Sequence, residues 1–230
     1  MTSIKSNLNE ISKSIFETAQ KNDRNPENIM LIAVSKRKSA ATIREAIDAG
    51  AANFGENYIQ EAIGKIDDIG KNNVCWHFIG HLQSNKAKFA VKYFDYIHTV
   101  DSVKLTKEID KQARRIDKIQ KILLQVNISK ETTKSGTTTE GLTALIRKIN
   151  RFKNISVQGL MCMPPYFSDP EDARRYFKKL VLLKEKILDL GLENISMNHL
   201  SMGMSNDYKV AIAEGSTMVR VGTSIFGVRD

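Results

Sequence analysis

The sequence predicts an α/β protein that folds as a single (β/α)8 barrel, also called a TIM barrel, with one extra helix at its N-terminus. Eight short apolar runs each lead into a helix or a helical turn. No linker long enough to separate two domains interrupts them, so residues 1–230 are expected to form one domain. The length of 230 residues is also close to the roughly 250 that are usual for such a barrel.

A doubly wound open sheet is the alternative fold for alternating strands and helices. That fold more often places a glycine-rich turn directly after its first strand, where the phosphates of a dinucleotide bind. Here residues 35–40, which follow the first apolar run, read SKRKSA and contain no glycine. The closed barrel is therefore favoured.

The first half of the chain begins with a helix that stands outside the repeating pattern. Residues 4–20 carry Ile4, Leu8, Ile11 and Ile15 at steps of 4, 3 and 4, which predicts an amphipathic helix covering the bottom or the side of the barrel. The apolar run over 28–36 is typical of a strand buried on both faces. Ser39 can cap the next helix, and Gly50 can end it. Further strands, each followed by a helix, are predicted over 53–57, 74–81 and 96–100.

The second half continues the alternation with longer connections. The strand-like run 121–129 precedes a polar loop and a helix over 140–149. The run 155–163 precedes a loop in which Asp169 is expected to cap a helix that starts at Pro170. This helix carries Tyr176, Leu180, Leu183, Ile187 and Leu190 at steps of 4, 3, 4 and 3 before Gly191. The last two units pair strands at 195–203 and 217–222 with helical segments at 206–213 and 223–227.

Composition excludes several classes of protein. Charged residues make up 27% and apolar residues 41%, a globular balance that excludes wholesale disorder. Two cysteines, Cys75 and Cys162, are too few for a disulfide framework and indicate a reducing compartment. The N-terminus has no apolar signal-peptide core, and no run reaches the roughly 18 apolar residues of a membrane span. A cytoplasmic protein without a membrane partner is expected.

The formal net charge of +9 raises the question of nucleic-acid binding. The lysines are spread along the chain, however, as is usual for the solvated faces of many helices. The sequence contains no RNA-binding aromatic signature, no zinc-finger spacing and no long basic run. A nucleic acid is therefore not the expected partner.

Lys36 is the first candidate functional residue, because the active sites of barrels lie at the carboxyl ends of the strands. It ends the apolar run AVSK, so its stem is expected to lie against the barrel mouth. A lysine that loses hydration there has a lowered pKa, and its neutral amine attacks carbonyl groups. The alternative is a lysine that extends its ammonium group into water, which is common at a strand end.

The loops after the seventh and eighth strands form the second candidate feature. The segment SMGMSND combines Ser201, Gly203 and Ser205 just before a helix, and VRVGTS places Gly222 and Thr223 at the start of a helical turn. Glycine allows close backbone approach, and helix N-termini favour anions. Barrels commonly hold a phosphate in these two loops. Two ordinary capped turns are the alternative.

A nucleophilic lysine facing a phosphate site suggests a phosphorylated aldehyde, and pyridoxal 5′-phosphate (PLP) fits. Arg220 supports this choice, because PLP proteins place a charged partner at the pyridine nitrogen. An arginine cannot give up its proton, so it would keep that nitrogen unprotonated. Such a ring is a weaker electron sink, which disfavours transamination.

The remaining chemistry-bearing residues have structural explanations. His77 and His81 are spaced H-x-x-x-H in a strand-like run, not on a helix, and lack the glutamate of a zinc protease, so no metal is predicted. The five methionines between Met161 and Met204 are expected to pack the mouth, and Cys162 is expected to be structural. Lys134 and Gly136 lie in a loop, KETTKSG, that could extend over the mouth or simply be solvated.

Seven motifs resemble those of the PLP homeostasis protein family, whose fold is similar to the N-terminal barrel of alanine racemase. They run from end to end of the chain: AVSK (33–36), FGENYIQE (54–61), WHFIGHLQSNK (76–86), KSG (134–136), GLMCMPP (159–165), LSMGMSNDY (200–208) and VRVGTSIFG (219–227). Together these motifs are very specific, and the fold that they imply agrees with the eight strands counted above.

This resemblance implies that residues 1–230 form a PLP-binding domain in which Lys36 carries PLP as a Schiff base. It also implies that Ser201, Gly203, Gly222 and Thr223 hold the phosphate, that Arg220 faces the pyridine nitrogen, and that Asn57 and Ile79 line the ring. The family is regarded as a PLP carrier or reservoir that supports vitamin B6 homeostasis and amino-acid balance, without an established enzymatic activity. The implied partners are PLP and, transiently, PLP-dependent apoenzymes, and a monomer is expected.

Two enzymatic alternatives remain at this point. The first is a small PLP-dependent racemase or lyase that uses Tyr58 or Tyr208 as its base. Racemases of this fold take a second base from an additional β domain, for which the residues after Thr223 leave no room, so two-sided proton exchange is not expected. The second alternative is a Schiff-base aldolase without a cofactor, which would be colourless where a PLP protein is coloured.

Overall fold

The computed structural model describes residues 3–71, 74–131, 134–193 and 195–227. Within these residues, eight parallel strands form a closed barrel in which each strand pairs with the next and β8 pairs with β1. The strands are β1 (Met30–Val34), β2 (Asn53–Glu56), β3 (Cys75–Phe78), β4 (Tyr96–Val100), β5 (Gln120–Gln125), β6 (Ile155–Met161), β7 (Ile195–Met204) and β8 (Met218–Val221). The predicted (β/α)8 barrel is confirmed.

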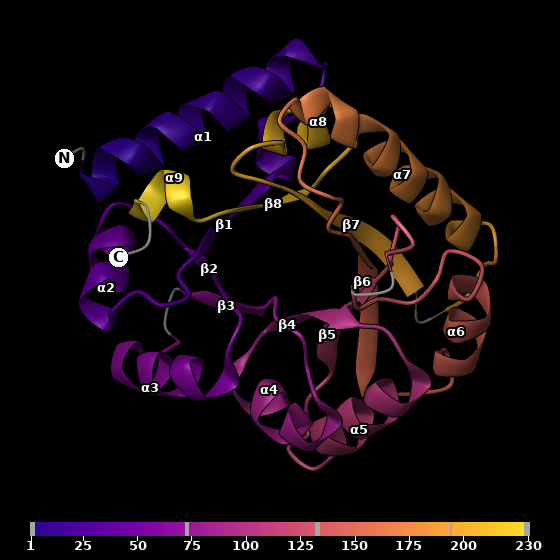
Figure 1. Ribbon diagram of the computed structural model, residues 1–230. Coiled ribbons are helices and arrows are strands. Elements are labelled where there is room, and N and C mark those ends of the chain that lie inside the picture. The colour runs from indigo at the N-terminus through magenta and orange to yellow at the C-terminus, as the bar shows by residue number, and fades with distance from the viewer. Residues whose placement is uncertain (1–2, 72–73, 132–133, 194, 228–230) are drawn as a thin grey trace.

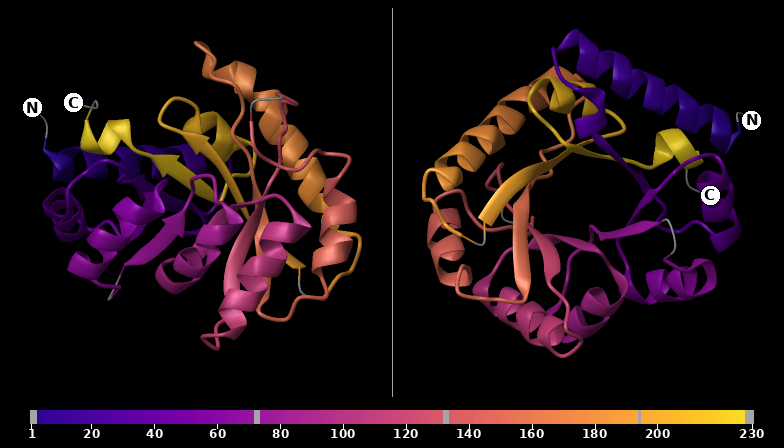
Figure 2. Two further views of the ribbon diagram at one scale, coloured as in Figure 1. Left: turned by 60° about the horizontal axis from the view of Figure 1, so that its bottom comes forward. Right: turned by 180° about the vertical axis from the view of Figure 1, so that it is seen from behind.

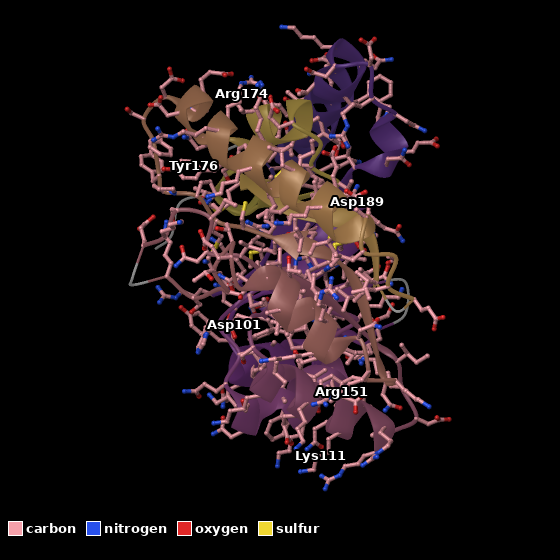
Figure 3. The ribbon with its side chains drawn as sticks, turned by 90° about the vertical axis from the view of Figure 1, so that its right-hand side faces the viewer. Asp101, Lys111, Arg151, Arg174, Tyr176 and Asp189 are labelled. Carbon is pink, nitrogen blue, oxygen red and sulfur yellow. The ribbon has the colours of Figure 1, made fainter. Side chains whose placement is uncertain are left out.

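Helices surround this barrel, as the opposite views in Figures 1 and 2 both show. They are α1 (Ile4–Lys21), α2 (Ala40–Asp48), α3 (Ile59–Ile69), α4 (Ala87–Tyr93), α5 (Val103–Arg114), α6 (Leu142–Ile149), α7 (Arg174–Leu188), α8 (Tyr208–Ala213) and α9 (Thr223–Phe226). Three 3₁₀ turns, η1 (Pro26–Asn28), η2 (Ser84–Lys86) and η3 (Pro170–Ala173), complete the described helical segments. In the side view of Figure 3, Asp101, which follows β4, lies toward one end of the barrel, and Arg151, which follows α6, lies toward the other.

The cap residues explain where several helices begin. Ser39 accepts a hydrogen bond from the Thr42 backbone N–H and starts α2, as predicted. Asp169 accepts from the Glu171 N–H, but the segment that starts at Pro170 is a 3₁₀ turn, and the α-helix begins only at Arg174. A short 3₁₀ turn likewise precedes α4.

The extra N-terminal helix packs against the side of the barrel, outside the strands. Its buried residues are Leu8, Ile11, Ile15 and Ala19, three of which belong to the apolar stripe predicted from the sequence. It lies against α8 and α9 (Figure 1), and the Asn7 side chain donates to the Ile225 carbonyl over 3.0 Å. The N-terminal helix thus fixes the segment that follows β8.

The described part of the chain contains two buried apolar clusters, which differ greatly in size. The larger lies between the strands and the helices and includes Trp76, Phe54 and Phe78. The smaller contains Ile32, Tyr96, Leu123, Met161 and Met218. These five residues come from strands β1, β4, β5, β6 and β8. The smaller cluster is limited in size because polar side chains on the barrel strands are also buried, among them His77, His98, Ser201 and Arg220.

No helix within the described residues is both long enough and apolar enough to cross a lipid bilayer.

Candidate functional site at the carboxyl ends of the strands

The predicted site residues all lie near or beyond the carboxyl ends of five strands. Lys36 follows β1, Asn57 follows β2 and Ile79 follows β3, while Gly222 and Thr223 follow β8. Ser201 and Gly203 lie in the last part of β7, and Arg220 lies in β8. Because the strands are parallel and the barrel is closed, these ends meet around one mouth.

Close backbone approach brings the segment after β8 to the end of β1. A Cβ atom on Gly222 would lie 3.2 Å from the Val34 carbonyl oxygen and 3.3 Å from the Val34 Cβ. Val34 is the last residue of β1, two positions before Lys36. The segment predicted to bind phosphate therefore lies beside the end of β1, which the candidate lysine follows.

A similar close approach joins β2 and β3. A Cβ atom on Gly80 would lie 2.0 Å from the Asn57 carbonyl oxygen, so only glycine fits there. The neighbouring Ile79 is almost fully buried, and its Cδ1 would lie 2.9 Å from a Cβ atom on Gly55. The Asn57 side-chain oxygen is buried without a hydrogen-bond partner. Asn57 and Ile79 thus present an unused acceptor and an apolar surface next to each other.

Lys36 is half buried, and a network of buried charges supports its backbone. The Lys65 ammonium donates to the Ser35 carbonyl over 2.8 Å, to Glu56 over 2.8 Å and to Glu61 over 2.5 Å. Glu61 also accepts from the backbone N–H of Arg37, whose φ of 62° is in the left-handed region. The residues on both sides of Lys36 are therefore held by α3.

Glu56 is the fully buried member of this network. Its Oε1 accepts from the Ser35 hydroxyl over 2.7 Å, whereas its Oε2 has no hydrogen-bond partner. Burial raises the pKa of Glu56, and the hydrogen bonds from Lys65 and Ser35 act in the opposite direction. Because a buried charge is costly when it is unpaired, Lys65 is needed wherever Glu56 is ionised.

Arg220 is 4% exposed and is held by neutral oxygen acceptors. It donates to the Ser201 hydroxyl over 2.5 Å and to the Cys162 carbonyl over 2.9 Å. Among the described residues, no carboxylate forms a salt bridge with it. Desolvation lowers the pKa of the Arg220 guanidinium, while nearby Cys162 and Asp207 act in the opposite direction.

The structure shows a competing role for Ser201, which was predicted to hold a phosphate. The residue is fully buried, and its hydroxyl is hydrogen-bonded to both Arg220 and His98. Ser205 is only half buried, in the turn between β7 and α8, and Thr223 is exposed. The phosphate role of Ser201 stays a prediction, and a phosphate contact would require its present hydrogen bonds to change.

The two histidines of the H-x-x-x-H pattern differ in burial. His77 is fully buried, whereas His81 is exposed and lies 3.2 Å from the Ser135 hydroxyl. That contact joins the loop after β5 to the loop after β3, although residues 132–133 of the KETTKSG segment lie outside the described residues. Lys134 is paired with Glu131 over 2.7 Å. Within the described residues, no cluster of three or more His, Cys, Asp or Glu side chains forms a metal site.

The two tyrosines considered as bases also differ in position. The Tyr208 hydroxyl donates to Ser14 in α1 over 2.8 Å, so it faces the N-terminal helix. Tyr58 is 48% exposed, at the residue before α3. Sequence reasoning placed Glu56 at the carboxyl end of a strand without giving it a role, and it missed His98 and Lys65 as parts of this region. Alternation in the run YIHTV was the one available signal, because it places His98 on the same face of the strand as Tyr96.

Comparison with known proteins shows the family. The sequence model of the family described as "Alanine racemase, N-terminal domain" matches residues 7–230. The protein named pyridoxal phosphate homeostasis protein in Vibrio alginolyticus is 42% identical over 234 residues, which cover 100% of this chain and 99% of that protein. Its namesake in Pseudomonas aeruginosa is 40% identical and is covered over 97% of its length. The chain belongs to the pyridoxal phosphate homeostasis protein family.

Solved structures agree with this assignment. PipY of Synechococcus elongatus, in a structure described as having PLP bound, is 37% identical with a TM-score of 0.81, over 93% of this chain and 100% of PipY. Alanine racemase from Clostridium difficile matches with a TM-score of 0.73 over 99% of this chain and 57% of the racemase. At 16% identity, the racemase shows a common fold alone.

Proposed function

We propose that this protein binds PLP at the carboxyl mouth of the barrel and serves as a carrier or reservoir in PLP homeostasis. The observation that carries the proposal is the likeness to PipY, whose structure is described with PLP bound and which matches this chain along almost its whole length. The names of the curated relatives support the same function.

The residues at the mouth fit this cofactor. When bound, PLP supplies an aldehyde that condenses with a primary amine and a phosphate that binds hydrogen-bond donors. Lys36, which follows β1, offers the amine, and Gly222 lies beside the end of β1. Gly203, Gly222 and Thr223 would hold the phosphate with Ser201 or with Ser205 in the turn after β7. The unpartnered Asn57 oxygen is an acceptor available to a bound ring, and Ile79 supplies an apolar surface.

Arg220 favours holding the cofactor over using it in catalysis. Its guanidinium stays protonated and donates hydrogen bonds only, so a ring nitrogen facing it would accept one and would remain unprotonated. Such a ring withdraws electrons less effectively than one protonated through a carboxylate. We therefore propose that the protein is not an enzyme.

A PLP-dependent racemase or lyase is the second candidate function. The fold of alanine racemase favours it, and Tyr58 remains exposed near the mouth as a candidate base. The hydrogen bond of Tyr208 to Ser14 disfavours the other tyrosine.

The two cysteines bear on the cellular compartment of the protein. The free thiols of Cys75 and Cys162 agree with a reducing compartment, and we propose that the protein is cytoplasmic. We further propose that it acts as a monomer and meets PLP-dependent apoenzymes transiently.

Covalent trapping tests the binding proposal. Purified protein loaded with PLP is reduced with borohydride, and the labelled peptide is identified by mass spectrometry. We expect the label on Lys36, its loss in Lys36→Arg, and its retention in the control Lys38→Arg. A label mainly on another lysine contradicts the assignment, and a colourless protein that takes up no PLP supports a cofactor-free aldolase.

Transfer of the cofactor tests the carrier proposal. The loaded protein is mixed with a PLP-dependent apoenzyme, and recovery of that enzyme's activity is followed against an equal amount of free PLP. The borohydride-reduced protein is the control, since its cofactor cannot leave. Equal rates of recovery from the reduced and unreduced proteins would contradict transfer.

A further inference from the structure

A chain of hydrogen bonds crosses the barrel from Arg220 to Asn53. The Ser201 hydroxyl, which accepts from Arg220, lies 3.0 Å from His98 Nδ1. His98 Nε2 lies 3.0 Å from His77 Nδ1, and His77 Nε2 lies 3.3 Å from the Asn53 side-chain oxygen. The five residues come from β8, β7, β4, β3 and β2, and the middle three are fully buried.

The two end members of this series of hydrogen bonds, Arg220 and Asn53, determine the direction of every bond in it. Arg220 can only donate, and the Asn53 oxygen can only accept. His77 therefore carries its proton on Nε2 and accepts at Nδ1, which makes His98 the donor through its own Nε2–H. His98 Nδ1 is then an acceptor, and the Ser201 hydroxyl donates to it. All four hydrogen bonds point from Arg220 toward Asn53, with both imidazoles neutral.

The surroundings keep the two rings neutral. Tyr96 stacks on His77, with ring centroids 4.9 Å apart and an interplanar angle of 8°. Burial lowers the pKa of His77 to about 3 and that of His98 well below its ordinary value. Positive charge on Arg220 and Lys121 and the neighbouring ring of His199 act in the same direction.

We propose that His98, supported by His77, is a positioning residue that fixes the Arg220 guanidinium through the Ser201 hydroxyl. A serine hydroxyl with a single neighbour is free to rotate, whereas here its hydrogen is held by His98 Nδ1. Its lone pairs are thereby directed to Arg220, which has no carboxylate partner among the described residues. Two of the five guanidinium N–H groups are occupied by Ser201 and Cys162, and the orientation of the remaining three is set for a bound group.

The inference deepens the proposed function, because the group that Arg220 would face is the ring nitrogen of PLP. It predicts that the barrel interior controls the electronic state of the cofactor through residues that do not touch it. His98 and His77 act on Arg220 alone, so removing them should alter the spectrum of bound PLP more than its capture.

The first test uses the protein without PLP. Nitrogen NMR of the histidine rings should show His77 and His98 as neutral Nε2–H tautomers from pH 6 to 8, and the Arg220 side-chain N–H protons should exchange slowly with water. In His98→Phe these protons should exchange about 10-fold faster, the factor that corresponds to about 1.4 kcal/mol. His98→Asn should retain slow exchange, because its oxygen can accept from Ser201 in place of Nδ1. His199→Phe is the matched control, because it removes a histidine ring that takes no part in the hydrogen bonds from Arg220 to Asn53.

The second test uses the PLP-loaded protein and its visible absorbance. His98→Phe should shift the absorption band toward that of Arg220→Met, while His98→Asn and His199→Phe should keep the wild-type band. A purely structural role for His98 would lower the melting temperature without moving the band. An Nδ1–H tautomer in either ring, or unchanged Arg220 exchange in a folded His98→Phe, would overturn the proposal. If wild-type protein takes up no PLP, the proposed function fails while the first test still decides the inference.

Discussion

The Lys65 ammonium group donates a hydrogen bond to the carbonyl oxygen of Ser35 over 2.8 Å, directly before the candidate cofactor-binding residue Lys36. Lys65 also neutralises the fully buried Glu56, so one side chain from α3 both balances a buried charge and fixes the backbone on which Lys36 stands. The stability of the barrel and the position of the site are therefore linked through Lys65.

Replacing Lys65 with methionine should destabilise the protein by about 3–5 kcal/mol, because Glu56 would remain as an uncompensated buried charge. Chemical denaturation of Lys65→Met measures this loss. The double variant Lys65→Met, Glu56→Gln should recover part of it. Lys71→Met, at an exposed lysine that bonds the Lys92 carbonyl, should change stability by less than about 0.5 kcal/mol. If Lys65→Met lost no more stability than Lys71→Met, this would contradict the role assigned to the buried charge.

Gly203→Ala should be more destabilising than Gly50→Ala, although both glycines have a positive φ, +93° and +100°. Both substitutions strain the backbone by about 1–2 kcal/mol. A Cβ atom on Gly203 would in addition lie 2.6 Å from the Cβ of Ala211 in α8, whereas one on Gly50 meets nothing within 4 Å. We expect an extra loss of about 1–3 kcal/mol at Gly203 from overpacking. Equal losses in thermal denaturation would show that α8 moves aside freely.

The free energy of unfolding should fall as the pH is lowered from about 6.5 toward 3. The His77 pKa is about 3 in the folded protein and about 6.5 in an unfolded chain, so between these values only the unfolded state binds the proton. Each pH unit then costs about 1.4 kcal/mol for His77, and His98, whose pKa is also lowered, adds to the slope. Denaturation at a series of pH values should show a smaller slope in His77→Phe than in the wild-type protein. A wild-type stability that is constant from pH 7 to 4.5 would contradict neutral buried rings.

The PLP-loaded protein should not exchange the α-hydrogen of common amino acids at an enzymatic rate. Arg220 weakens the electron sink that carbanion formation needs, and Tyr208 is bound to Ser14 in α1. Proton NMR of amino acids in deuterium oxide measures this exchange, with an alanine racemase as the positive control. Exchange at about 1 per second or faster, in the usual range of enzymes, would favour the racemase alternative. Its loss in Tyr58→Phe would then identify the base.

Much of the barrel could be predicted because the signals for strands and helices are local. The run MLIAV reads as a buried strand and forms β1, and Ser39 caps the next helix as expected. The ends of elements were less predictable. The run 121–129 ends as a strand at Gln125, because the Thr137 N–H donates to the Gln125 carbonyl and the chain turns into the following loop. That hydrogen bond joins residues 12 apart, which a local pattern does not register.

The local pattern of strands and helices was enough to predict the order of the eight strands and the gathering of Lys36, Arg220 and Gly222 at their carboxyl ends, because parallel strands in a closed barrel end on one side. That pattern did not predict what each buried polar side chain binds, which became visible in the folded barrel. Ser201 was predicted at the phosphate, yet its hydroxyl is held between Arg220 and His98, from strands 19 and 103 residues away. Hydrogen bonds reach only about 3 Å, so the strand register and the packing inside the barrel select these partners. Separation along the chain carries no information about them.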